Sequence, residues 1–78
     1  YLINLRVKDK NAVMEDQEVL AEVAKVEEII NGNGRVLLRQ SGTEPVIRVM
    51  VEAETDELCK AHAHGIYDFI KERGHAND

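Results

Sequence analysis

The chain has 78 residues, of which 44% are hydrophobic and 32% charged, and it carries a formal net charge of −5. A chain of this length forms one small domain, which buries only about 60% of the surface that its unfolded form exposes. The negative charge, with only two tyrosines and one phenylalanine as aromatic residues, argues against a nucleic-acid-binding surface, because such a surface needs a basic field and stacking platforms.

The setting of the chain follows from cysteine usage and hydropathy. Cys59 is the single cysteine, which excludes an internal disulfide and indicates a reducing, cytoplasmic environment. No run of about 18 apolar residues is present, so we expect no membrane span. The chain starts at Tyr1, without an initiator methionine and within a strand-like pattern, and we therefore expect a fragment of a longer protein.

The first element is predicted to be a strand over residues 1–8, because apolar and polar residues alternate with a period of two. Residues 8–11 are charged and typical of a turn, and Val13 and Met14 are expected to anchor the entry to the next element. The apolar face of the strand comprises Tyr1, Ile3, Leu5 and Val7.

A helix is predicted over residues 16–30, where apolar residues recur at steps of three and four. Asp16 is the expected N-cap, and Glu18 lies in the first turn, where the helix dipole favours an acid. Asn31–Gly34 ends the helix, since either glycine can take the left-handed conformation. These four residues are not expected to bind phosphate, because glycine-rich phosphate loops run from strand to helix. The predicted apolar stripe comprises Val19, Leu20, Val23, Val26 or Glu27, and Ile30.

Two β-branched runs, residues 35–39 and 46–53, predict two strands joined by a short loop. Thr55 is then expected to cap a last helix that ends at Gly74. In the third strand Ile47, Val49 and Val51 are expected to face one way, and Val46, Arg48 and Met50 the other. The apolar stripe of the last helix is predicted to comprise Leu58, Cys59, His62, Ile66, Phe69 and Ile70.

These elements predict an α+β fold in the order β-α-β-β-α. We expect a two-layer sandwich in which two helices pack on one face of a small, mainly antiparallel sheet of three to four strands. Three strands are evident from the pattern.

The three histidines do not predict a metal site. His62 and His64 are two residues apart on a helix and cannot face one ion together. His75 lies in a tail that we expect to be frayed. His62 is interpreted as a packed or rim residue.

The loop between the last two strands carries the chemistry of an anion site. Ser41 and Thr43 each offer a hydroxyl, and Gly42 permits close approach of a ligand and tolerates a positive φ. Successive backbone N–H groups in a turn can form a concave anion site. Arg39 and Arg48 flank the loop, and each can bind a phosphate through two parallel hydrogen bonds. This set suits a tetrahedral dianion.

An ordinary hairpin remains the alternative from the residues alone, because Ser, Gly, Thr and Pro are common in turns. Arg48 interrupts an apolar strand, and it lies either exposed at the end of the sheet or directed at a ligand of the loop. Pro45 lacks an N–H and biases Glu44 toward an extended conformation, which stiffens the exit of the loop.

The stretch Arg39-Gln40-Ser41-Gly42-Thr43-Glu44-Pro45, followed by Arg48, resembles the phosphate-binding loop of the α-D-phosphohexomutase superfamily. The run Gly34–Glu52 is most similar to members that act on glucosamine phosphates, and Arg6–Lys10 also resembles the family. The resemblance covers essentially the whole chain, residues 1–78, but only the fourth, C-terminal domain of a four-domain enzyme. Gln40 departs from the proline that is usual at this position.

The resemblance implies a sheet of about four strands with two helices, and it assigns roles to the residues of the loop. Arg48 is implied as a supporting arginine, and Glu44 and Pro45 as structural residues, with Glu44 orienting an arginine. The groups implied to hold the non-transferring phosphate of the substrate are Arg39, Ser41, Gly42 and Thr43.

The implied reaction interconverts glucosamine 6-phosphate and glucosamine 1-phosphate, for bacterial cell-wall amino sugars, in the cytoplasm. A phosphoserine on another domain exchanges phosphoryl groups with the sugar through a bisphosphate, assisted by Mg²⁺ held by aspartates of that domain. The implied partners are the phosphosugar and the other three domains, with no catalytic residue and no metal in this chain, which alone is expected to be inactive. The alternatives are the same domain of a mutase for mannose or glucose phosphates, or a stand-alone anion-binding module.

Overall fold

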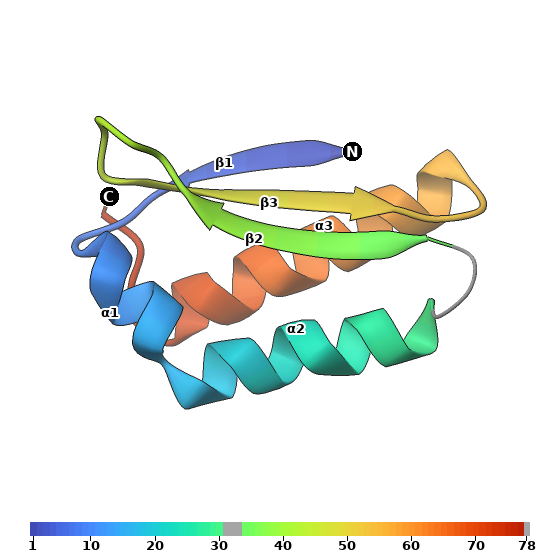
Figure 1. Ribbon diagram of the computed structural model, residues 1–78, viewed down its shortest axis with the longest axis horizontal. Coiled ribbons are helices and arrows are strands. Elements are labelled where there is room, and N and C mark those ends of the chain that lie inside the picture. The colour runs from blue at the N-terminus through green and yellow to red at the C-terminus, as the bar shows by residue number, and fades with distance from the viewer. Residues whose placement is uncertain (31–33, 78) are drawn as a thin grey trace.

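The computed structural model describes residues 1–30 and 34–77, which form one sheet and three helices (Figure 1). The elements follow one another along the chain in the order β-α-α-β-β-α. They are β1 (Leu2–Arg6), α1 (Lys10–Glu15), α2 (Gln17–Ile29), β2 (Arg35–Gln40), β3 (Val46–Glu52) and α3 (Asp56–Glu72).

The sheet has the strand order β1-β3-β2, and both pairings are antiparallel. The long helices α2 and α3 lie on the same side of this sheet, and its other face is left open (Figure 1). The predicted α+β class, with two helices covering one face of a small antiparallel sheet, is confirmed.

The core lies between the sheet and the helices, and it is almost entirely aliphatic. Alternation along the strands directs Leu5, Val7, Ile47, Val49 and Val51 into it, as predicted, and the last four are completely buried. The residues between them point to the open face, where Leu37 pairs with Met50 and Arg39 with Arg48.

Helix α1 was not predicted. Residues 8–11 were expected to form a turn, whereas a helix begins at Lys10 and runs to Glu15. Asp9 caps it by accepting hydrogen bonds from the amides of Asn11 (2.9 Å) and Ala12 (3.4 Å). Six residues are too few to show a helical period in sequence, and the stability of so short a helix comes from packing, here of the fully buried Val13.

The apolar stripes of the long helices differ from prediction at their edges. The N-caps Asp16 and Thr55 are confirmed, and each accepts a hydrogen bond from its own helix. Leu20 and Leu58 were expected to be buried but are 38% and 42% exposed. The buried face of α3 instead includes Ala63, which is completely buried and was not part of the predicted stripe.

The C-terminal segment is held against β1, although His75 was expected in a frayed tail. Lys8 N donates to His75 O (2.9 Å) and Asn77 N to Arg6 O (3.0 Å), around a β-bridge between Val7 and Ala76. Within the described residues this bridge is the only pairing beyond the three strands, so the fourth strand implied by the resemblance is reduced to one bridge.

Two glycines have clear structural reasons. Gly74 takes a positive φ of 86° after α3, as expected of a helix-ending glycine. Gly34 does not take a positive φ. A glycine is required there because a Cβ would collide with the carbonyl oxygen of Glu52 in β3. The rest of the predicted helix stop, residues 31–33, lies outside the described residues. Among the helices described, none has both the length and the hydropathy needed to cross a membrane.

Candidate phosphate-binding site

The loop of residues 41–45 joins β2 to β3 and rises on the open side of the sheet (Figure 1). Its base is closed by a hydrogen bond from Ser41 N to Val46 O (2.9 Å). Inside the loop, Glu44 N donates to Ser41 Oγ (3.4 Å) and Val46 N to Glu44 O (2.8 Å). The hydroxyl of Ser41 therefore shapes the turn, and its oxygen keeps a hydrogen to donate outward.

Two consecutive backbone amides of the loop, those of Gly42 and Thr43, donate to no acceptor within residues 1–30 and 34–77. Both residues are exposed, and a Cβ built on Gly42 would have open space around it. Gly42 does not use the positive φ that the lack of a Cβ would permit. Its smallness therefore leaves the peptide accessible, and an anion can approach two adjacent N–H groups and the Thr43 hydroxyl.

Lys10 is a further cation at this site, and it was not among the residues predicted to bind the phosphate. Its Nζ donates to Ser41 O at 2.7 Å, across 31 positions of sequence. The preceding segment is anchored beside the loop, because Val7 N donates to Pro45 O (2.8 Å). Arg6–Lys10 was one of the segments that resemble the family. Nothing in the sequence, however, indicated that Lys10 contacts the loop.

Arg39 and Arg48 are direct cross-strand partners on β2 and β3. Residues so paired have Cα atoms about 5 Å apart, and like charges there destabilise a sheet. Neither arginine forms an ion pair with any residue that the structure describes. Arg48 is thus exposed on the open face within β3, about two residues or ~7 Å along the strand from the base of the loop, rather than at the end of the sheet.

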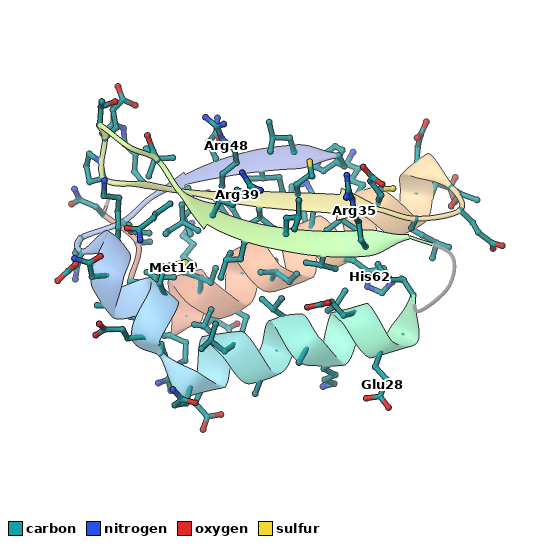
Figure 2. All side chains as sticks on the ribbon, in the orientation of Figure 1. Met14, Glu28, Arg35, Arg39, Arg48 and His62 are labelled. Atoms are coloured by element: carbon teal, nitrogen blue, oxygen red, sulfur yellow. The ribbon has the colours of Figure 1, made fainter. Side chains whose placement is uncertain are left out.

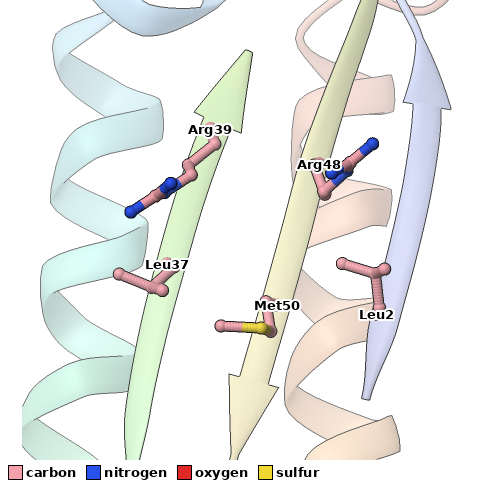
Figure 3. Close-up of a pocket in the computed structure, with 5 residues that line it drawn as sticks. All are labelled: Leu2, Leu37, Arg39, Arg48 and Met50. Carbon is pink, nitrogen blue, oxygen red and sulfur yellow. The ribbon is translucent and has the colours of Figure 1, made fainter. Parts of the chain in front are cut away.

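Figure 3 shows how the two arginines lie: Arg39 extends from β2 away from β3, whereas Arg48 extends from β3 toward β1. Together with Leu2, Leu37 and Met50 they line a shallow hollow of about 320 Å³ on the open face. The two guanidinium groups point apart and do not converge on one point. Both side chains are exposed, and exposed side chains change rotamer within nanoseconds, so packing does not fix either guanidinium in its present direction.

Glu44 and Pro45 lie at the end of the loop next to β3. The carboxylate of Glu44 forms no ion pair with an arginine among the described residues, so no orienting contact is observed. Pro45 offers its carbonyl to Val7 N, which ties the loop to the segment after β1. Gln40, in place of the usual proline, is the last residue of β2 and pairs with Ile47.

Metal-binding groups do not gather at this site. Within residues 1–30 and 34–77, no three His, Cys, Asp or Glu side chains are close enough to share an ion. His62 is half-buried at the far end of the molecule from the loop (Figure 2), and the exposed His64 lies within 3.2 Å of the hydroxyl of Tyr1.

The strongest electrostatic cluster lies away from the loop, around Asp16. Arg73 donates to both carboxylate oxygens (3.0 and 3.1 Å), and His75 Nε2 lies 2.8 Å from Oδ2. The hydrogen bonds from Arg73, and then from His75, hold the pKa of Asp16 well below its usual range, and the hydrogen bond to Asp16 raises the pKa of Arg73. The cluster ties the start of α2 to the end of α3 and the C-terminal segment.

Similarity to known proteins identifies the family of the chain. Residues 2–69 match the family model described as phosphoglucomutase/phosphomannomutase, C-terminal domain. The chain belongs to this family. It is 56% identical over 72 residues to a protein of Shouchella clausii named phosphoglucosamine mutase, and 53% identical over 70 residues to one of Halalkalibacterium halodurans with the same name. A protein of Staphylococcus carnosus, also so named, is 51% identical over 72 residues.

The matches cover 90–92% of this chain but only 16% of the length of each of these relatives. The similarity therefore concerns one C-terminal domain of considerably longer proteins.

Proposed function

We propose that residues 1–78 form the C-terminal domain of a phosphoglucosamine mutase and that the domain binds the phosphate of the substrate that is not being transferred. The observation that carries this proposal is the pair of adjacent, exposed amides of Gly42 and Thr43 that have no acceptor within the described chain. The proposed ligand groups are these amides, the hydroxyls of Ser41 and Thr43, and the side chains of Arg39 and Arg48.

The charge distribution supports a small anion as the ligand. The domain is acidic overall, at −5, yet the segment from Arg35 to Arg48 contains three arginines and one acid, Glu44. Lys10 adds a fourth cation from another part of the chain. Guanidinium groups, hydroxyls and backbone amides recognise a phosphate by its shape and charge. An isolated basic region on an acidic domain suits a phosphate monoester better than a polyanion.

The arrangement also explains how one site serves both halves of the proposed reaction. The bisphosphate intermediate carries a phosphate at either end, and each must be held in turn while the other reacts. Donors that read only the phosphate accept either end equally. Holding the remote phosphate positions the reacting end and supplies orientation.

The nature of the sugar is proposed from the relatives alone. None of the five residues that line the hollow beside the arginines is acidic, so the hollow offers no ion-pair partner for an amino group. The relatives named phosphoglucosamine mutase favour glucosamine 6-phosphate and glucosamine 1-phosphate over the mannose and glucose phosphates.

The covalent chemistry is proposed to lie on the part of the longer protein that precedes this domain. A phosphoserine and a Mg²⁺ ion held by aspartates would supply phosphoryl transfer there, in the cytoplasm. The carboxylates described here do not form a cluster that fits a metal ion. This domain contributes binding and orientation, and we expect no mutase turnover from the 78-residue chain alone.

The test is a titration of the 78-residue chain with glucosamine 6-phosphate, glucose 6-phosphate and inorganic phosphate, followed by backbone amide NMR. We expect the largest shifts at Gly42 and Thr43, with Ser41 next. Dissociation constants should be on the order of millimolar, because an open site keeps little of its interaction energy after the costs of binding. The two sugar phosphates should agree within about threefold, since the donors read only phosphate. Shifts centred on Asn31–Gly34, or none at all, would contradict the proposal.

A further inference from the structure

Lys10 occupies an unusual position for a surface lysine. It is half-buried, and its Nζ is bound to the backbone carbonyl of Ser41 at 2.7 Å. It forms no ion pair with any carboxylate of residues 1–30 and 34–77. Asp9 caps the helix that Lys10 begins, which fixes the backbone from which the side chain reaches the loop. The cation is thus held at the loop by backbone geometry, without a neutralising acid.

The carbonyl that Lys10 binds belongs to the same peptide group as the amide of Gly42. A trans peptide is planar, and its C=O and N–H bonds point in opposite directions. No described peptide bond is cis. A lysine that binds the Ser41 carbonyl at one edge of this planar group therefore directs the Gly42 N–H to the opposite edge, away from Lys10.

We propose that Lys10 is a positioning residue of the phosphate site, acting through the Ser41–Gly42 peptide. This inference rests on the proposed function, because it assumes that the Gly42 amide meets the anion. Binding of a cation to the carbonyl also draws electron density from the N–H and makes it a stronger donor. Without Lys10 the peptide is free to turn, and the loop must order it when phosphate binds.

Other cations of the segment do not share this role. Lys8 is two residues away and is exposed, and its side chain forms no hydrogen bond or ion pair with the described residues. A substitution of Lys8 removes the same charge from the same segment and leaves the Ser41 carbonyl bound. The pair Lys10→Met and Lys8→Met thus separates positioning from the general effect of charge.

The first measurement uses the 78-residue chain without ligand. A hydrogen bond to a carbonyl shifts the ¹⁵N resonance of the residue that follows, so Lys10→Met should move the ¹⁵N signal of Gly42 more than that of any other loop residue. Lys8→Met should leave it in place. Lys10→Gln serves as a second variant if Lys10→Met is not dispersed like the folded wild type, since it also leaves the Ser41 carbonyl without a cation.

The second measurement is the titration with inorganic phosphate. We expect Lys10→Met to weaken binding about tenfold, as loss of one charge-assisted contact does, and Lys8→Met to change it less than twofold. Equal weakening by both variants, or an unmoved Gly42 signal in Lys10→Met and Lys10→Gln, would overturn the positioning role while leaving the phosphate site intact. Failure of the wild type to bind at Gly42 and Thr43 would instead overturn the proposed function itself.

Discussion

The two ends of the open sheet face carry cross-strand pairs of opposite character. Arg35 on β2 faces Glu52 on β3, and their charged groups approach to 3.3 Å. Four residues further along β2, Arg39 faces Arg48. The same two strands, the same face and the same kind of side chain thus produce one neutral pair and one doubly positive pair.

The difference separates a structural contact from the proposed ligand site. Arg35–Glu52 is an exposed ion pair, which contributes at most about 1 kcal/mol. Arg39–Arg48 is expected to destabilise the free domain by a similar amount or less, because like-charged residues occupy directly paired positions on β2 and β3 while their guanidinium groups extend apart. The doubly positive pair is the one next to the loop. There the amides of Gly42 and Thr43 have no acceptor among the described residues, and Lys10 binds the Ser41 carbonyl. A bound anion would remove the repulsion, which is the reason to expect one there.

The largest effect is expected from removing one guanidinium at each end in turn. Arg39→Ala should weaken phosphate binding by more than about tenfold and abolish the shifts at Gly42 and Thr43, because it removes a charge-assisted bidentate contact. Arg35→Ala, four residues away on the same face, should bind phosphate within about twofold of wild type, since its charge is already neutralised. NMR titration measures both, and equal losses would mean that only net charge matters.

A smaller change makes the two ends alike. Arg48→Glu places an acid opposite Arg39, as Glu52 lies opposite Arg35. We expect the free energy of unfolding in urea to rise by roughly 0.5–1 kcal/mol, because a repulsive cross-strand pair becomes attractive. Phosphate binding should be lost in the same variant. A variant that gained no stability, or that still bound phosphate, would show that the Arg39–Arg48 pairing is not the source of the contrast.

The smallest effect on binding is expected at Asp16, which is remote from both pairs. Its pKa is lowered in the folded state, so its ion pair stabilises the fold fully above the unfolded pKa of about 3.9 and is lost as the pH falls below that value. Asp16→Asn keeps a good helix N-cap but removes the charge. It should lower the stability at pH 7 and flatten the loss of stability below about pH 4, with phosphate affinity unchanged at pH 7.

Urea unfolding of wild type and Asp16→Asn between pH 2 and 7 provides this measurement, because the other carboxylates titrate in both proteins and cancel in the difference. If the difference in free energy of unfolding between wild type and Asp16→Asn did not shrink in acid, the charges of Arg73 and His75 would contribute nothing to stability.

Much of the fold was predictable because its long elements are strongly periodic. The alternation in residues 1–8 and 46–53, and the caps at Asp16 and Thr55, determine where strands and helices lie with little help from the rest of the chain. Helix α1 was not predictable, because six residues hold less than two turns. Which side of α3 is buried, with Ala63 completely buried and Leu58 42% exposed, depends on how the helix packs against its neighbours, which no local pattern contains.

The sequence by itself determined the chemical character of the loop, which resides in the contiguous residues Arg39 to Pro45, and the family, whose pattern runs along residues 2–69. Only the tertiary structure decided which amides stay unbound, that Arg39 faces Arg48, and that Lys10 holds the Ser41 carbonyl. These features depend on strand register and on contacts between residues 31 or more positions apart, and such contacts exist only once the chain has folded.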